Sequence, residues 1–352
     1  MKKTLIALAA VAATGAAFAQ SSVTLYGVAD VGAGKAGAAG ANLSNYSGSP
    51  QLGLSNDKFQ AIASNVLNNG TSRWGVRGVE DLGGGMKAGF NFEAGVNLAT
   101  GVGATSGYGA TSGGGTIRPA LVGSQLFSRA ANVALMGGFG EIRAGRSLTT
   151  SFYSVASWEL TGAANYSVVA NQFNYAGAAP RDSAQIMYNS PKFGGVSFSA
   201  STVLKGNEVF VDAAGNGLSK YDLSATYAEG PLTASIAYNE VDKADSNMAL
   251  GGKYNFGAFA VAGSYQVNGR TNAQDKKGFT LGVTAPMGPV TLTADIARAT
   301  NSNDKNTDFL LEAKYALSKR TFVYGVYMRD GAAPGAASKS VNGYAVGVRH
   351  NF

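Results

Sequence analysis

A period-two alternation of apolar and polar residues runs from Val23 to the end of this chain, in segments of about ten residues separated by turn-forming residues. Because successive side chains of a strand point to opposite faces, each segment predicts a strand with one apolar and one polar face. In two of the clearest segments the charged residues Asp295, Glu312 and Lys314 all lie opposite the apolar residues. Segments of this length and pattern are typical of strands that cross a bilayer at a tilt.

Sixteen such segments can be counted, and an even number suits a closed antiparallel sheet in a bacterial membrane. We therefore predict an all-β fold, a 16-stranded antiparallel transmembrane β-barrel. The predicted strands span residues 22–33, 71–80, 86–98, 127–137, 140–148, 183–190, 193–205, 219–229, 231–241, 246–255, 258–268, 277–286, 289–299, 306–317, 319–329 and 340–352.

The connections between these segments alternate in length. One set consists of tight turns such as Asp81–Gly85 and Pro286–Pro289, whereas the first three of the other set run to roughly 20 to 40 residues. Short periplasmic turns and long external loops give a membrane barrel this asymmetry. A soluble β-sandwich also alternates, but it would not combine sixteen long segments, one-sided long loops and few charges.

The composition supports a membrane barrel. Charged residues make up 14% of the chain, against about 25% in a typical soluble protein, and glycine occurs 49 times. Beyond the N-terminal stretch no apolar run approaches the roughly 18 residues that a membrane helix needs, so a helical membrane protein is excluded. The chain contains no cysteine, which excludes disulfides, thiolate metal sites and a catalytic thiol.

The N-terminus has the pattern of a secretory signal peptide. Lys2 and Lys3 precede a short apolar stretch, and Ala17-Phe18-Ala19 supplies the small-residue cleavage pattern before Gln20. We expect a cleaved signal peptide over residues 1–19 and a single barrel domain over residues 20–352. The chain should therefore be exported.

The final stretch, Tyr344–Phe352, predicts the strand that closes the barrel. One of its faces carries Tyr344, Val346, Val348, His350 and Phe352, and the other face is polar or small. Its free edge must pair with the strand near Val23, because an unpaired backbone edge in a membrane is costly.

The chain contains five motifs in this order: Val23–Gly27, Ser72–Gly83, Gly145-Arg146, Tyr188–Pro191 and Gly347–Phe352. Their order and spacing make the chain resemble the general diffusion porins of Gram-negative bacteria, of the betaproteobacterial and neisserial type. The resemblance implies a homotrimer in the outer membrane, contact with outer-membrane lipid and lipopolysaccharide, and a third long loop, residues 148–182, folded into the lumen as the constriction loop. It also implies that the outward face of the last strand is the signal read by the outer-membrane assembly machinery.

The residues expected to act are those that set the size and the field of the pore. Alternation directs Arg73, Arg77 and Arg143 toward the lumen as a basic wall. Arg146 joins them only by resemblance, because simple alternation from Ile142 directs it outward and its lumenal placement needs a bulge.

The constriction loop is rich in aromatic residues, so folding it into the barrel would remove them from water. Glu159 is the predicted acid of this loop, and Asp30 and Asn189 are weaker lumenal candidates. The sequence departs from the family pattern in two places: the Pro-Glu-Phe-Gly-like motif is reduced to Trp158-Glu159-Leu160, and a basic residue near Tyr188 is missing. Fewer wall arginines imply milder selectivity.

The expected function is a water-filled channel for passive diffusion of ions and small hydrophilic solutes, with a mild anion preference because net charge is positive. The alternatives are a substrate-specific channel for a sugar or organic anion and, third, a structural or adhesive barrel. We expect no enzyme activity, because the only histidine, His350, lies on the outward face and leaves a nucleophile without a base. We also expect no cofactor, no metal and no nucleic acid partner.

Deleting Phe352 should reduce the amount of assembled barrel more than it reduces transport through the barrels that form. The physical reason is that the terminal aromatic belongs to the predicted assembly signal and not to the pore wall. Heat-modifiable gel mobility of the membrane fraction measures assembly. Wild-type levels of folded protein without Phe352 would refute this role.

Overall fold

The computed structural model describes residues 22–36, 58–103, 116–117, 126–176, 179–244, 246–269, 274–301, 305–331 and 340–352. The predicted signal peptide lies outside these ranges, as does most of the glycine-rich stretch after Gly103.

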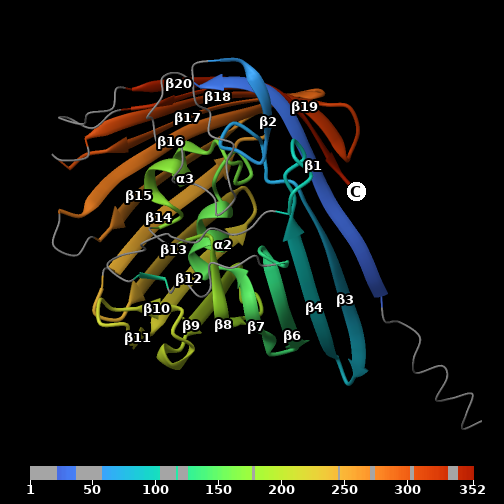
Figure 1. Ribbon diagram of the computed structural model, residues 1–352, viewed down its shortest axis with the longest axis vertical. Coiled ribbons are helices and arrows are strands. Elements are labelled where there is room, and N and C mark those ends of the chain that lie inside the picture. The colour runs from blue at the N-terminus through green and yellow to red at the C-terminus, as the bar shows by residue number, and fades with distance from the viewer. Residues whose placement is uncertain are drawn as a thin grey trace, which may run out of the picture.

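Sixteen strands form a closed ring in which each strand pairs antiparallel with the next along the chain (Figure 1). The ring closes where β1 pairs with β20 over Val28↔Asn351 to Ala36↔Gly343. Gly27 and Phe352 extend this seam by exchanging two backbone hydrogen bonds of 3.0 Å. The predicted barrel is confirmed. Its strands are β1 (Ser22–Ala36), β3 (Arg73–Gly83), β4 (Met86–Gly95), β6 (Ala130–Gly137), β7 (Gly140–Leu148), β8 (Arg181–Asn189), β9 (Val196–Val203), β12 (Lys220–Glu229), β13 (Leu232–Val241), β14 (Ser246–Asn255), β15 (Ala260–Asn268), β16 (Lys276–Met287), β17 (Val290–Ala299), β18 (Asn306–Ala316), β19 (Thr321–Asp330) and β20 (Val341–Asn351).

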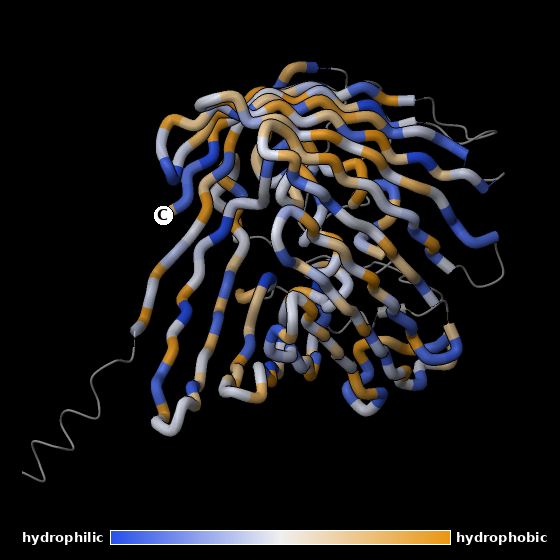
Figure 2. The backbone as a smooth tube through the Cα atoms, turned by 180° about the vertical axis from the view of Figure 1, so that it is seen from behind, coloured by the Kyte–Doolittle hydropathy of each residue, from blue (hydrophilic) through white to orange (hydrophobic). Residues whose placement is uncertain are grey.

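Large apolar side chains cover the outside of the ring. Leu25, Leu281 and Val346 are each more than half exposed. The residues next to them along each strand point inward and are mainly polar or small. Figure 2 shows this alternation along the strands, with hydrophilic residues at several strand ends. Such an exterior is stable only where the surroundings are apolar, as in a bilayer. The closed ring also gives every strand two paired edges, which a strand in hydrocarbon requires.

The two rims of the ring differ, as the connection lengths predict. On the short-turn rim β12 joins β13 with Glu229 opposite Leu232, and β16 joins β17 with Met287 opposite Val290. Gly230 and Gly288 have positive φ at these turns, where a side chain would strain the backbone. The opposite rim carries the long connections and is called the long-connection rim below.

Two long connections pack inside the ring instead of standing above it. Between β7 and β8 lie α2 (Thr150–Ala156) and α3 (Val168–Phe173), and both helices lie within the barrel in Figure 1. Between β1 and β3 lies β2 (Gln60–Ala63), which pairs with β1, followed by an irregular segment whose Leu67 is fully buried. The third loop therefore enters the lumen as predicted, and the inward fold of the first connection was not foreseen.

Three buried clusters hold these inner segments. The largest joins Leu67 and Tyr166 to inward residues of β18 and β19, and a second packs Trp158 and Val155 against β13 and β14. The third lies under the connection from β9 to β12, which contains η2 (Lys205–Asn207), β10 (Phe210–Val211) and β11 (Gly217–Leu218). There β10 pairs with β11 and with β5 (Thr116–Ile117). None of the helices in the described ranges is long and apolar enough to cross a membrane.

Substituting Gly251→Ala should lower the free energy of unfolding by about 1–3 kcal/mol, because overpacking forces buried groups to move. A Cβ at position 251 would overlap Cε2 of the buried Trp158 ring, which belongs to the inner loop. Urea unfolding in detergent, followed by tryptophan fluorescence, measures the loss.

Gly325→Ala is the matched control, because nothing lies within 4 Å of a Cβ at that strand position. Equal stability of the two variants would contradict the packing of Trp158 against β14.

Candidate functional site

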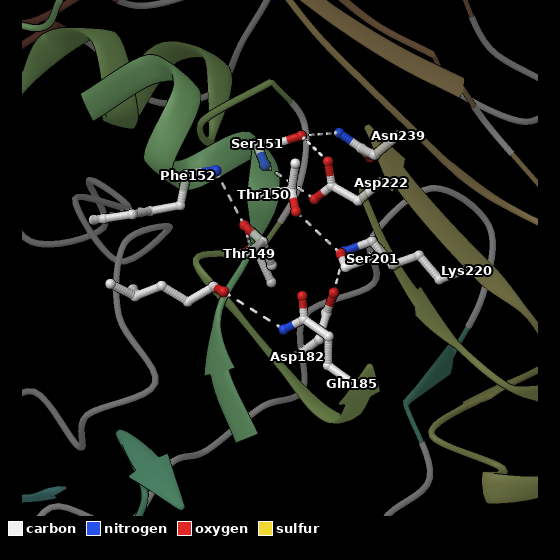
Figure 3. Close-up of polar contacts among 12 residues, drawn as sticks. Thr149, Thr150, Ser151, Phe152, Asp182, Gln185, Ser201, Lys220, Asp222 and Asn239 are labelled. Carbon is white, nitrogen blue, oxygen red and sulfur yellow. Dashed lines mark hydrogen bonds and ion pairs between the residues drawn. The ribbon is translucent and has the colours of Figure 1, made fainter. Parts of the chain in front are cut away.

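The inner loop between β7 and β8 is fastened to the barrel wall at the start of α2. Thr149 caps the helix by accepting a hydrogen bond from the Phe152 backbone N–H at 3.1 Å. Ser151 donates to Asp222 of β12 twice, from its backbone N–H at 3.1 Å and from its hydroxyl at 2.7 Å. Figure 3 shows Asp222 pointing at this first turn from the wall. The carboxylate thus compensates unpaired N–H groups at the positive end of the helix.

A buried polar network surrounds this anchor. Lys220 and Asp182 form an ion pair of 2.8 Å with side chains 1% and 3% exposed. Asn239 donates to the Ser151 hydroxyl at 3.0 Å (Figure 3). It also donates to the Ala176 carbonyl at 2.8 Å, so one wall residue binds both ends of the α2–α3 region. Removing one member would leave buried groups unpaired, so the network holds the loop in one position.

Glu159 follows α2 and is turned into the loop. Its carboxylate accepts from the Thr161 hydroxyl at 2.5 Å, from the Ala163 N–H at 2.7 Å and from the Ser167 hydroxyl at 2.7 Å, and the residue is 4% exposed. These bonds close the turn that leads into α3. The role of Glu159 as a pore acid stays a prediction, while its contacts are those of a residue that shapes the loop.

Tyr166 links the loop to the opposite part of the wall. Its hydroxyl donates to Glu312 of β18 at 2.5 Å and accepts from Asn69 at 2.7 Å. Burial raises the pKa of the Tyr166 hydroxyl well above its ordinary value, and the Glu312 carboxylate raises it further. The hydroxyl therefore stays protonated and remains a donor over the whole working pH range.

The first connection meets the third inside the barrel. Asn165 donates to the Asn65 carbonyl at 3.0 Å. Asp30, which is completely buried, accepts from Asn68 at 3.0 Å, from the Gly70 N–H at 2.8 Å and from the Tyr324 hydroxyl at 2.7 Å. Asp30 thus lies on the interior face as expected, but it binds the first connection and is not exposed to the lumen.

Four arginines, here called the arginine cluster, gather near this connection: Arg73 of β3, Arg129 just before β6, Arg181 of β8 and Arg349 of β20. Arg73 and Arg129 share one carboxylate, that of Glu93, at 3.4 and 2.6 Å. Arg181 donates to the Arg129 carbonyl at 3.0 Å, and Arg349 donates to Asn69 at 2.7 Å.

Positive charge exceeds negative charge in the arginine cluster. Burial lowers the pKa of the Arg129 guanidinium, and the charges of Arg181 and Arg73 lower it further. Such crowding of like charges is unfavourable unless counter-ions are near. The side chain of Arg73 remains 21% exposed, so part of the cluster is accessible to solvent.

Two of the other predicted wall arginines, Arg77 and Arg143, contact different neighbours. Arg77 lies over the Tyr26 ring at 4.9 Å. Arg143 pairs with Glu141 at 2.6 Å and donates to the Tyr153 hydroxyl of α2 at 3.2 Å. The basic wall thus touches the inner loop at Arg143.

Arg146 lies beside an irregularity in the wall. The register between β7 and β8 shifts between Gly145 and Ser147, and Gly145 has a φ of +118°. This is the bulge that a turn of Arg146 away from the outer face requires. Arg146 is nine-tenths buried and donates to the Ser128 carbonyl at 2.6 Å and to the Ser183 hydroxyl at 2.7 Å.

The remaining candidates lie away from the arginine cluster. Asn189 ends β8 at the short-turn rim and donates to Glu141 at 3.0 Å. The five residues proposed as the assembly signal alternate along β20 onto its outer face, where Tyr344 and Val346 are 47% and 60% exposed. His350 stacks beside Phe352 there, away from the lumen. No three of the described His, Asp and Glu residues are arranged to hold a metal ion.

The sequence could have revealed two of the missed residues. Arg349 and Glu93 both lie on the inward face by alternation, from Val348 and from Phe92 respectively. Arg129 and Arg181 stand at strand starts next to long connections. Their approach to Arg73 depends on the path of those connections, which alternation does not describe.

Comparison with known proteins gives consistent results. The family model for Gram-negative porins matches residues 4–333. The chain is 31% identical to outer membrane porin protein 32 of Delftia acidovorans and 29% identical to an outer membrane porin protein of Bordetella pertussis, over the full length of each. Its structure resembles an anion-selective porin from Comamonas acidovorans, with 25% identity, a TM-score of 0.69, and coverage of 95% of this chain and 100% of that one. OmpT of Vibrio cholerae shares the fold at 12% identity and a TM-score of 0.62, over 94% and 98% of the two chains.

Substituting Glu159→Ala should speed hydrogen exchange of backbone amides over residues 157–173, because it removes three hydrogen bonds that close this turn. Each buried donor left without a partner costs about 1–3 kcal/mol. Hydrogen–deuterium exchange mass spectrometry measures the effect.

Glu240→Ala is the control, since Glu240 bonds to Tyr238, whose side chain is exposed. Unchanged exchange in the Glu159 variant would show that the carboxylate does not hold the loop, and would favour the pore-acid interpretation.

Proposed function

The chain belongs to the Gram-negative porin family and forms an outer-membrane channel for passive diffusion, and we propose that the arginine cluster gives this channel its preference for anions. The solutes are ions and small hydrophilic molecules.

The observation that carries this proposal is the unequal number of charges at the cluster. Arg73, Arg129 and Arg181 lie around the carboxylate of Glu93, and Arg349 lies near that of Asp30, which leaves a formal charge of 4 − 2 = +2. A lumen lined by one sign of charge raises the local concentration of the opposite ion. The similar porin from Comamonas acidovorans is described as anion-selective, which supports the same sign here.

The inner segments set the size limit. A barrel of sixteen strands would otherwise enclose a wide aqueous channel, and here the first and third connections fill part of it from one side. Arg73, Arg77 and Arg143 stand on strands β3 and β7. Arg143 touches Tyr153 of the inner loop at 3.2 Å, so the basic wall and that loop together border the pore.

The expected partners fit the outer surface. We infer a homotrimer, contact with outer-membrane lipid and lipopolysaccharide, and recognition of β20 by the assembly machinery. An apolar groove on the outside of the seam, lined by Val31, Gly325, Val346 and Val348, supports subunit packing. The relatives are porins, which are channels, and we infer that this chain likewise catalyses no reaction.

Replacing Arg73 and Arg349 together with alanine should bring the anion-to-cation permeability ratio toward one. The Coulomb energy of a unit charge near a lumenal ion corresponds to about a two- to tenfold change in permeability per guanidinium. The reversal potential in a planar bilayer with asymmetric potassium chloride gives the ratio.

Lys319→Ala is the control, because Lys319 lies in the short turn between β18 and β19. Cation preference in the wild type, or an unchanged ratio in the double variant, would refute the role of the cluster. Saturable block of the current by one solute would instead indicate a substrate-specific channel.

A further inference from the structure

The outer surface carries a row of basic side chains near the long-connection rim. Lys277, Arg298 and Arg329 come from β16, β17 and β19, each close to the end of its strand next to a long connection. They are here called the basic row. None of them can contribute to the pore, because they lie on the outside of the barrel.

Alternation along each strand establishes this outward direction. Lys277 shares a face with Phe279, Arg298 with Leu292, and Arg329 with Tyr327. Those three apolar side chains are 43%, 43% and 37% exposed on the outside of the ring. In contrast, the neighbouring Lys276 points inward and donates to Gln172 of α3 at 3.3 Å.

The register brings the three bases to one height. Arg298 lies opposite Phe279, so Lys277 is its diagonal neighbour on β16. On the other side Arg298 lies opposite Thr307 and donates to its hydroxyl at 2.7 Å. Arg329 lies opposite Phe309, two residues along from Thr307. With strands about 4.8 Å apart and a two-residue displacement along the strands on each side of Arg298, the row spans roughly 20 Å over four strands.

The basic row lies directly above an apolar surface of the barrel. Below it lie Leu281 of β16, Leu292 of β17 and Leu311 of β18, which are 54%, 43% and 46% exposed. Asp275, two residues before Lys277, is the acid beside the row, so the local formal charge is 3 − 1 = +2. Bases above lipid-facing leucines match a ligand with phosphates at the level of its head group and acyl chains below.

We propose that the basic row is a binding site for the phosphates of lipopolysaccharide, with Lys277, Arg298 and Arg329 as the contacting residues. The proposal rests on the outer-membrane location and makes the inferred lipopolysaccharide contact specific. The row stands at the rim of the long external loops, and the outer leaflet there contains the phosphorylated glycolipid. Arginine suits phosphate because its guanidinium can donate two parallel hydrogen bonds.

The test compares the wild type with the triple variant Lys277→Gln, Arg298→Gln, Arg329→Gln, both purified in detergent and freed of lipid. Binding of fluorescent rough-type lipopolysaccharide is titrated, and its dephosphorylated form and phosphatidylglycerol serve as competitors. The expected result is binding roughly ten- to a hundredfold weaker in the triple variant. The dephosphorylated glycolipid should compete poorly with both proteins.

The double variant Lys319→Gln, Arg320→Gln is the matched control, because it removes basic residues at the opposite end of β19. It should bind lipopolysaccharide like the wild type. If the triple variant folds poorly, Arg329→Gln alone is used, since this residue is exposed and its replacement disturbs no packing.

Two outcomes overturn the proposal: equal affinity in wild type and triple variant, or equal competition by phosphatidylglycerol, which would show a general attraction for anionic head groups. The reversal potential of the same preparations separates this result from the channel proposal. It should be unchanged in the triple variant, because the row faces away from the lumen. Cation preference in the wild type would refute the role of the arginine cluster and would leave the result on lipopolysaccharide binding unaffected.

Discussion

The pairing of β1 with β20 is the contact on which the remainder of the structure depends. Without it the sheet would have two open edges, and each unpaired N–H or carbonyl in hydrocarbon costs several kcal/mol. Nine residue pairs from Val28↔Asn351 to Ala36↔Gly343, together with the Gly27–Phe352 bonds, remove both edges. Closure also divides the surface in two, so that one face of every strand meets lipid and the other meets the lumen.

Closure of the ring also encloses an interior that must be partly filled. A ring of this size encloses more space than inward side chains can fill, and two connections enter it with their own small cores, around Leu67 and around Trp158. Buried carboxylates hold them: Asp222 at the start of α2 and Asp30 under the first connection. The arginine cluster forms at the boundary that remains, because β3, β8 and β20 bring Arg73, Arg181 and Arg349 to the same place.

Sequence and structure agree best where the chain alternates. The strand limits agree to within a few residues, and Arg143 lies on the interior side as its parity predicted. Alternation does not describe the contacts made by the long connections: the carboxylate of Asp30 on β1 accepts from the first connection, and that of Glu159 accepts from donors in its own loop. The pore-acid role of Glu159 stays a prediction. Arg129 and Arg181 escaped notice because they begin strands beside connections without a period. The prediction of fewer wall arginines therefore did not count Arg129 and Arg181.

The order of residues alone determined the strand number, the lipid-facing residues and the sign of the net charge, since each follows from a local period of two and from composition. Tertiary structure decided which charged side chains bind the inner connections. The donors to Glu159 lie within eight residues, but they belong to an irregular loop whose path alternation does not describe. Asp30 binds the first connection because donors far away in the sequence, such as Tyr324, reach it only when the ring closes. The same holds for the basic row, whose three members share one height because of the register between strands.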